Sequence, residues 1–182
     1  SMICEEQDVD VWELIELANL HPRVSILEPG PGVGGHCIAV DPWFLVASSP
    51  KISPLIRTAR EVNDRKPHWV LDRIRSAIQV FQGQHMQTEP ANSPKPKVVI
   101  FGLAFKPDID DFRHSPAVEI LNTLKADRNI RLSAVEPNLT DHHFNDVPIE
   151  ALDDACETAD IAVMLVNHKE FYASAPRTPF QV

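Results

Sequence analysis

Apolar residues recur at helical spacing near the start of the chain, which predicts a first helix. They are Val11, Leu14, Ile15 and Ala18. Asp8 or Asp10 can cap this helix, and the helix should end before Pro22. Further along, Asp41 and Pro42 are typical of a helix start, with the aspartate at the cap and the proline in the first turn.

A longer apolar series begins after Ser53-Pro54 and predicts a helix over residues 55–81. Its members are Leu55, Ala59, Val62, Val70, Ile74, Ala77 and Phe81. Pro67 lies inside the series and should kink or split the helix. The apolar surface of residues 55–81 exceeds what a lone helix tolerates, which favours packing against a partner.

The pattern changes after a polar stretch, residues 82–96, that contains glycine and several prolines and is typical of a linker. Beyond it, three apolar runs at 97–102, 131–135 and 160–166 predict strands. They alternate with helices that begin at Ser115-Pro116 and at residue 151. This order predicts an α/β fold with a Rossmann-like parallel sheet.

Ligands of such sheets bind at the carboxyl ends of the strands, here residues 102–106, 136–138 and 167–168. We therefore expect a helical region over 1–81, a linker over 82–96 and a nucleotide-binding domain over 97–182. The stretch after Phe171 is turn-like, so the last strand of that domain is expected to be missing or replaced. Together with the opening Ser1-Met2, this suggests a fragment.

The formal net charge of −9 argues against a nucleic-acid partner, which would require a basic surface. No apolar run is long enough to span a bilayer, so no membrane partner is expected. The three cysteines are widely separated, which disfavours a disulfide framework or a zinc site and favours the cytoplasm. His142 and His143 have no third ligand nearby, so we expect a solvated pair and no metal site.

The segment Gly30-x-Gly32-x-x-Gly35 matches the dinucleotide fingerprint by its letters. It does not follow a strand or lie in a βαβ unit, so we reject that interpretation. Glycines there instead let the backbone pass close to a ligand and hold Cys37 in place. A free cysteine is more often a buried structural thiol, but Cys37 precedes a helix start that can stabilise a thiolate.

Two long motifs carry a resemblance to a known family. Residues 29–44 read PGPGVGGHCIAVDPWF, and residues 101–116 read FGLAFKPDIDDFRHSP. Both resemble signatures of the UDP-glucose/GDP-mannose dehydrogenase family, in the right order and spacing. Residues 58–64, TAREVND, are similar to the central helix of that family. The resemblance covers nearly all of residues 3–171.

The resemblance implies a reaction and a substrate. The family oxidises C6 of a nucleotide sugar to a carboxylate with two NAD⁺, through a thiohemiacetal and a thioester on a cysteine. His36 and Val40 stand where the enzymes acting on glucose usually have serine and lysine. This form resembles that of family members acting on UDP-N-acetylmannosamine, whose uronic acid enters surface polysaccharides. Dimerisation through the central helices is also implied.

The resemblance also assigns residues. Cys37 matches the nucleophile, and Asp41 matches an acidic residue that orients water or assists proton transfer; its alternative is a helix cap. Phe105 and Lys106 match positions that contact the nucleotide sugar, with a surface lysine as the alternative. The remaining assignments to the sugar pocket are Gly32, Gly34 and Gly35. Through a gapped alignment, Arg23 matches an arginine donated to the sugar site of the partner subunit.

Arg113 matches an arginine that reaches the NAD phosphates; its alternative is an ion pair with Asp110 or Asp111. The family's N-terminal NAD domain has no counterpart in this sequence. We therefore expect weak NAD binding and no turnover by the chain itself, and His114 departs from the usual glutamate. Two other functions stay open: a dimerising, non-catalytic UDP-sugar-binding module, and a thiol-dependent hydrolase or transferase using Cys37. The latter would need a histidine base close by, and the side chain of the adjacent His36 is expected to point elsewhere.

Overall fold

The computed structural model describes residues 1–88, 95–174, 176 and 178. Contacts divide the chain into two compact units, Ser1–Gly30 and Pro31–Val182, and each is described by itself. The N-terminal unit contains α1 (Met2–Glu6) and α2 (Val11–Asn19). Asp10 caps α2 by accepting hydrogen bonds from the backbone of Trp12 and Glu13, so the second of the two candidate caps is the one used.

The core of the second unit is a parallel three-stranded sheet, which confirms the predicted Rossmann-like arrangement. Its strands are β1 (Lys97–Phe101), β2 (Arg131–Val135) and β5 (Ile161–Met164), in the order β2-β1-β5. Val99 of β1 pairs with Ser133 on one side and Ala162 on the other. A small antiparallel hairpin, β3 (His143–Phe144) and β4 (Val147–Pro148), was not predicted.

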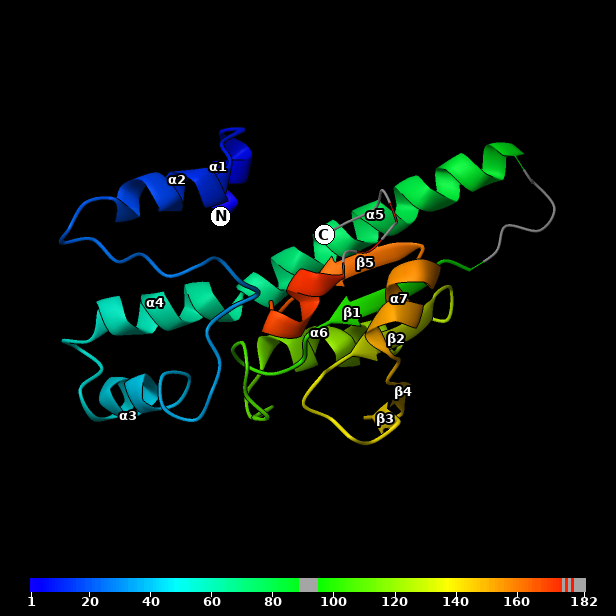
Figure 1. Ribbon diagram of the computed structural model, residues 1–182. Coiled ribbons are helices and arrows are strands. Elements are labelled where there is room, and N and C mark those ends of the chain that lie inside the picture. Colours follow the sequence, from blue (N-terminus) through cyan, green and yellow to red (C-terminus); the bar gives the residue numbers. More distant parts are fainter. Residues whose placement is uncertain (89–94, 175, 177, 179–182) are drawn as a thin grey trace. The chain divides into compact units, whose positions relative to one another are not determined.

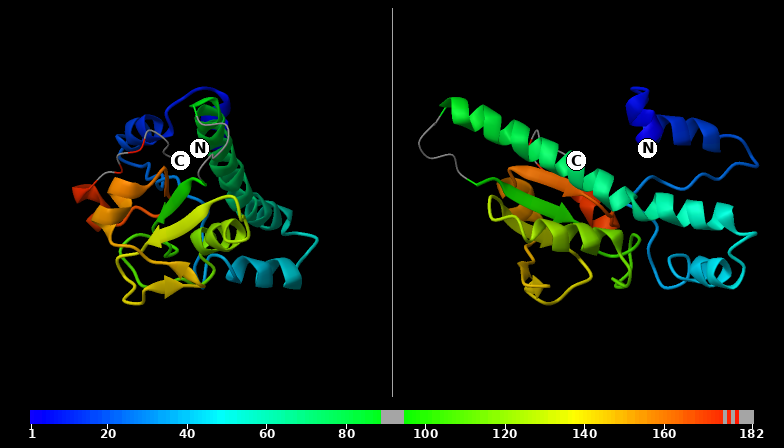
Figure 2. Two further views of the ribbon diagram at one scale, coloured as in Figure 1. Left: turned by 90° about the vertical axis from the view of Figure 1, so that its right-hand side faces the viewer. Right: turned by 180° about the vertical axis from the view of Figure 1, so that it is seen from behind.

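Helices cover both faces of this sheet (Figure 1 and Figure 2). Val98 and Ile100 of β1 pack in one apolar cluster with α5 (Lys66–Thr88) and α6 (Pro116–Leu124). Val99 and Phe101 point the other way, into a cluster with α7 (Leu152–Thr158) and the 3₁₀ helix η1 (Lys169–Ala173). The chain passes from β1 to β2 on one side and then crosses back to β5 on the other side of β1. Ligands of such sheets bind where this reversal occurs.

The helices before the sheet are α3 (Asp41–Ser48), α4 (Pro54–Asp64) and α5. The predicted long helix is split at Arg65, two residues before Pro67, as expected. Val40, not Asp41, is the N-cap residue of α3, so the aspartate is the first helical residue and not a cap. Helix α5 runs to Thr88, so the first residues of the predicted linker are helical; residues 89–94 of that linker lie outside the described part.

The apolar face of α5 is buried inside the second unit. The buried residues are Val70, Leu71, Ile74, Ile78 and Phe81. This face therefore cannot supply the partner interface that was expected from residues 55–81. Leu55 and Val62 of α4 and Val80 of α5 are exposed, so these apolar side chains remain available to a partner. Within the described residues, no helix is long and apolar enough to cross a bilayer.

Candidate functional site

The loop that carries Cys37 packs tightly against the loop that follows β1. Gly35 has a φ of +92°, and a Cβ added there would lie 3.0 Å from the ring of Phe105. A Cβ added at Gly34 would overlap the carbonyl oxygen of His114 and lie 2.8 Å from Pro116 Cδ. Glycine is therefore required for the two motifs to approach this closely. The two sequence motifs, residues 29–44 and 101–116, are therefore in direct contact.

Asn63 of α4 holds the glycine loop from the other side. Its side-chain oxygen accepts a hydrogen bond from Val33 N at 2.8 Å, and its Nδ2 donates to Val33 O at 3.2 Å. One amide side chain therefore satisfies both backbone groups of Val33 in the way that a neighbouring strand would. In the sequence, Asn63 is recognisable only as part of the helical segment 58–64. Its spacing from the glycine loop does not predict a contact with Val33.

Cys37 is exposed, which excludes the interpretation of a buried structural thiol. Its carbonyl oxygen accepts hydrogen bonds from Val40 N at 3.0 Å and Asp41 N at 2.8 Å, so the cysteine lies on a turn that leads directly into α3. The positive end of a helix dipole stabilises a nearby thiolate. By contrast, Cys156 is buried, and desolvation raises the pKa of its thiol.

Arg113 lies beside this loop in an ion pair with Asp111. Arg113 Nη2 is 2.6 Å from Asp111 Oδ2, and Nε is 2.9 Å from Oδ1, which is a two-point contact. The hydrogen bond from Arg113 holds the pKa of Asp111 well below its usual range. Arg113 Nη2 also lies 3.2 Å from His36 Nδ1. The pKa of Arg113 is raised mainly by its hydrogen bond to Asp111 and to a smaller extent by the Cys37 side chain. Asp111, and not Asp110, is thus the partner of the ion-pair alternative.

Phe105 connects the two motifs. It is half-buried, it lies edge-on to His36 with ring centroids 6.5 Å apart, and it faces Gly35. Lys106 is exposed, with its ammonium 5.8 Å from the centroid of the Phe105 ring. The loop of Cys37 is thus in contact with Phe105 and Arg113, and Lys106 lies next to Phe105. Arg23 is exposed in the N-terminal unit, so its assignment to the sugar site stays a prediction.

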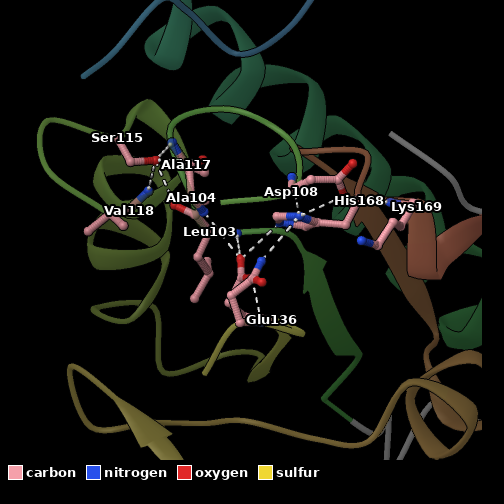
Figure 3. A network of polar contacts seen from close by, with 10 residues as sticks. Leu103, Ala104, Asp108, Ser115, Ala117, Val118, Glu136, His168 and Lys169 are labelled. Atoms are coloured by element: carbon pink, nitrogen blue, oxygen red, sulfur yellow. Dashed lines mark hydrogen bonds and ion pairs between the residues drawn. The ribbon is translucent and has the colours of Figure 1, made fainter. Parts of the chain in front are cut away.

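A buried polar network joins the carboxyl ends of all three strands, at the place where ligands were expected (Figure 3). The carboxylate of Glu136, after β2, accepts hydrogen bonds from Leu103 N at 2.7 Å and Ala104 N at 3.2 Å, just after β1. His168, after β5, lies 3.2 Å from the same carboxylate through Nε2. The strand pattern had predicted these three ends to converge, but it gave no reason to expect a buried charge there.

The hydrogen bonds define the charge state of the network. Burial by itself raises the pKa of Glu136, but hydrogen bonds from His168 and from the backbone of Leu103 and Asn138 lower it more, and the net pKa is below the usual range. His168 Nδ1 accepts a hydrogen bond from Asp108 N at 3.0 Å, so the imidazole proton belongs on Nε2 and is donated to Glu136. The pair therefore consists of a carboxylate and a neutral histidine.

Oxygen and nitrogen atoms of Asp108, His168 and Glu170 lie within 4.8 Å of one another, which is a spacing compatible with metal ligation. The Nδ1 lone pair of His168 already accepts the Asp108 N–H, however, and Asp108 Oδ1 accepts a hydrogen bond from Lys169 N at 3.0 Å. These contacts account for the cluster as part of the loop structure.

A cleft of about 970 Å³ lies between α3, α4 and α6. It is lined in part by Trp43, Phe44, Arg60 and Asn63. Arg60 is 7% exposed and pairs with Asp64 at 2.7 Å, while its Nε has no hydrogen-bond partner among the described residues. Cys37 does not line this cleft, although its neighbours Ala39 and Val40 do.

Comparison with known proteins agrees with this geometry. Residues 1–65 match the model of the central domain of the UDP-glucose/GDP-mannose dehydrogenase family, and residues 99–179 match the model of its UDP-binding domain. The glycine loop lies within the first match and the loop after β1 within the second, so the two matched regions are in contact. The chain belongs to the UDP-glucose/GDP-mannose dehydrogenase family.

Relatives within the family are similar over almost the whole chain. The UDP-N-acetyl-D-mannosamine dehydrogenase of Escherichia coli strain K12 is 49% identical over 94% of this chain. The NDP-N-acetyl-D-galactosaminuronic acid dehydrogenase of Ralstonia solanacearum is 50% identical, also over 94%. The match spans 40% of the length of the first of these proteins and 38% of the second.

Solved structures show the same fold. A UDP-N-acetyl-mannosamine dehydrogenase from S. aureus superimposes with a TM-score of 0.70 at 38% identity, covering 93% of this chain and 37% of that protein. One from Pyrococcus horikoshii gives a TM-score of 0.72 at 31% identity, with the same two coverages.

Proposed function

We propose that the chain is the part of an NAD-dependent UDP-sugar 6-dehydrogenase that carries the catalytic cysteine and binds the nucleotide sugar. The observation that carries the proposal is the position of Cys37. Its side chain is exposed on a turn that enters α3, and the loop around it contacts Phe105 and lies beside Arg113. An exposed thiol beside the UDP-binding domain fits a reaction at the sugar of a UDP-sugar.

The proposed substrate is UDP-N-acetylmannosamine, and the product is its uronic acid, used for surface polysaccharides. Similarity to the mannosamine enzymes at 49% identity supports this choice, and similarity at 50% to an enzyme of the galactosamine series supports a 2-acetamido sugar in general. His36 replaces the serine expected of enzymes acting on glucose, and it touches Arg113 in the structure.

In the proposed chemistry, the first oxidation of C6 gives an aldehyde. The Cys37 sulfur then adds to C6, a carbon–sulfur bond forms, and the carbonyl oxygen takes up a proton to give a thiohemiacetal. Loss of a hydride and a proton from this adduct gives a thioester. Water attacks C6, the carbon–sulfur bond breaks, and the thiolate leaves with the uronic acid released. Asp41, exposed at the start of α3, is the proposed group that orients this water.

NAD, when bound, supplies the acceptor for both hydrides. The described residues do not form a dinucleotide cradle: the Gly30-x-Gly32-x-x-Gly35 segment follows no strand, and the N–H groups after β1 are bound to Glu136. Only Arg113 is assigned a contact with the cofactor, in line with its exposed side chain. We therefore expect the chain by itself to bind NAD weakly and to produce no NADH.

The remaining assignments complete the proposal. Lys106 and Phe105 hold the nucleotide sugar, and Arg23 is proposed to serve the sugar site of the partner subunit. The protein is proposed to be cytoplasmic and to form a homodimer through its helical region, where Leu55 and Val62 of α4 are among the exposed apolar side chains. The second candidate is a dimerising UDP-sugar-binding fragment without catalysis; the absence of a dinucleotide cradle from the described residues favours it.

Two measurements test the proposal. Calorimetric titration of the chain should show binding of UDP and UDP-N-acetylmannosamine and little binding of NAD⁺. Alkylation of Cys37 by iodoacetamide, followed by mass spectrometry, should slow when UDP-N-acetylmannosamine is present, while alkylation of Cys4 stays unchanged. Equal alkylation of Cys37 with and without the sugar nucleotide would refute the site. Hydrolysis of a thioester or ester substrate, lost in Cys37→Ser, would instead favour the thiol hydrolase.

A further inference from the structure

The turn after β1 does not offer the usual nucleotide contacts. In dinucleotide-binding sheets, free N–H groups at this turn meet the phosphates, and an acidic residue after the second strand holds a ribose. Here the two elements bind each other, because Leu103 N and Ala104 N donate to Glu136 at 2.7 and 3.2 Å. Glu136 is 2% exposed, so neither side of this contact is open to a ligand.

The network also holds the far end of the same loop. His168 is fully buried, and its Nδ1 accepts the N–H of Asp108 at 3.0 Å while its Nε2 donates to Glu136 at 3.2 Å. Asp108 has a φ of +59°, a left-handed conformation that an unsupported residue of this type adopts only at some cost. On its other side, the loop is held by Ser115, whose hydroxyl donates to Leu103 O at 2.7 Å.

Phe105 and Lys106 lie between these two anchors. Phe105 is the residue that contacts the glycine loop at Gly35, and Lys106 extends from the same loop into solvent. The position of both side chains relative to Cys37 therefore depends on the buried pair behind them. Neither Glu136 nor His168 reaches the surface to touch a ligand itself.

We infer that Glu136 and His168 are positioning residues: the internal carboxylate occupies the phosphate position at the turn after β1, and the pair fixes the 103–108 loop so that a nucleoside diphosphate binds at Lys106. This inference rests on the proposed function for the identity of the ligand. It assigns no chemical step to either residue. It does assign the diphosphate to the side chain of Lys106 and not to the backbone of Leu103 and Ala104.

Three variants separate the contacts. Glu136→Gln keeps the shape but replaces one acceptor oxygen with a donor that faces other donors. His168→Asn keeps an acceptor near the Nδ1 position, and His168→Gln keeps a donor near the Nε2 position. Glu119→Gln, on the exposed face of α6, is the matched control for loss of a carboxylate. Each folded variant is titrated with UDP by calorimetry, and amide exchange is followed by NMR.

We expect UDP to bind about fivefold more weakly to Glu136→Gln, the factor given by loss of one ordinary hydrogen bond, and normally to Glu119→Gln. The Asp108 amide should exchange faster in His168→Gln and stay protected in His168→Asn. In the unchanged chain, UDP should shift the resonances of Lys106 more than the amides of Leu103 and Ala104. Lys106→Ala should weaken UDP binding while leaving these amides protected.

The inference is overturned if Glu136→Gln binds UDP as the unchanged chain does, or if UDP displaces Glu136 and bonds to the Leu103 and Ala104 amides. A chain that binds no UDP at all contradicts the proposed function instead. In that case the positioning role is decided by the NMR contact between Phe105 and Gly35: its loss in Glu136→Gln supports the role, and its persistence refutes it. If Glu136→Gln does not fold, the two His168 variants decide.

Discussion

Replacing Asn63 with alanine should loosen the glycine loop without unfolding the unit. The substitution removes two hydrogen bonds to Val33, of 2.8 and 3.2 Å. Each bond contributes about 1 kcal/mol, so the local opening free energy should fall by about 2 kcal/mol. At about 1.4 kcal/mol per factor of ten, the Val33 amide should exchange with solvent about thirtyfold faster.

The chain contains a matched control for this experiment. Asn19 makes the same pair of bonds to the backbone of Ile26, at 2.7 and 3.0 Å, in the N-terminal unit. Asn19→Ala should therefore raise exchange at Ile26 and leave Val33 unchanged, whereas Asn63→Ala should do the reverse. Hydrogen exchange followed by NMR gives the exchange rates of the Val33 and Ile26 amides in one experiment.

The same variant tests the link from the loop to the thiol. If Asn63 holds the loop in its binding geometry, UDP-N-acetylmannosamine should protect Cys37 from alkylation less well in Asn63→Ala than in Asn19→Ala. An unchanged exchange rate at Val33, or a Val33 rate that rises equally in both variants, would refute the reasoning from the two hydrogen bonds.

Three further predictions concern other contacts described above. Gly34→Ala should lower the free energy of unfolding in urea by about 1–3 kcal/mol or more, because its Cβ would overlap the carbonyl of His114. Gly83→Ala, in α5 with open space around the added Cβ, should instead raise it by about 0.5–1 kcal/mol, and equal effects of the two substitutions would contradict this reasoning. Ser115→Ala should lower the melting temperature through a loss of about 1–3 kcal/mol, since its buried hydroxyl bonds to Leu103 and caps α6. Because the pKa of Glu136 is lowered in the folded chain, this carboxylate stabilises the fold above the usual carboxyl pKa, and the stabilisation is lost as the pH falls through the lower pKa of the folded state. Below about pH 4, the free energy of unfolding should therefore fall less steeply with pH in Glu136→Gln than in the unchanged chain.

Much of the fold follows from the sequence because its signals are local. The β1 and β5 runs are apolar on both faces, and the buried parallel sheet is the structure that such runs form. Ser115-Pro116 predicted the start of α6, and the capping hydroxyl is present there. The apolar face of α5 was predicted to form a partner interface, but it packs against the chain's own sheet. A series of apolar residues does not indicate whether a partner chain or the same chain will bury it.

The candidate site was only partly predictable. Cys37 and Phe105 were found because they lie in long motifs, and the structure adds that they belong to touching loops. Glu136 and His168 are single residues at strand ends, and nothing in their local spacing indicates a shared buried charge. Asn63 was hidden for the same reason, since its bonds join residues thirty positions apart.

The close approach of Gly34 to His114 and Pro116 ties together two stretches of sequence that are far apart in the gene. Where there is no room for a methyl group, neither stretch can change its backbone path without a matching change in the other. Chimeric genes made from two relatives should therefore work when both stretches come from one parent. Crossovers placed between them should more often yield misassembled products, and a library of such hybrids would reveal the pairing directly.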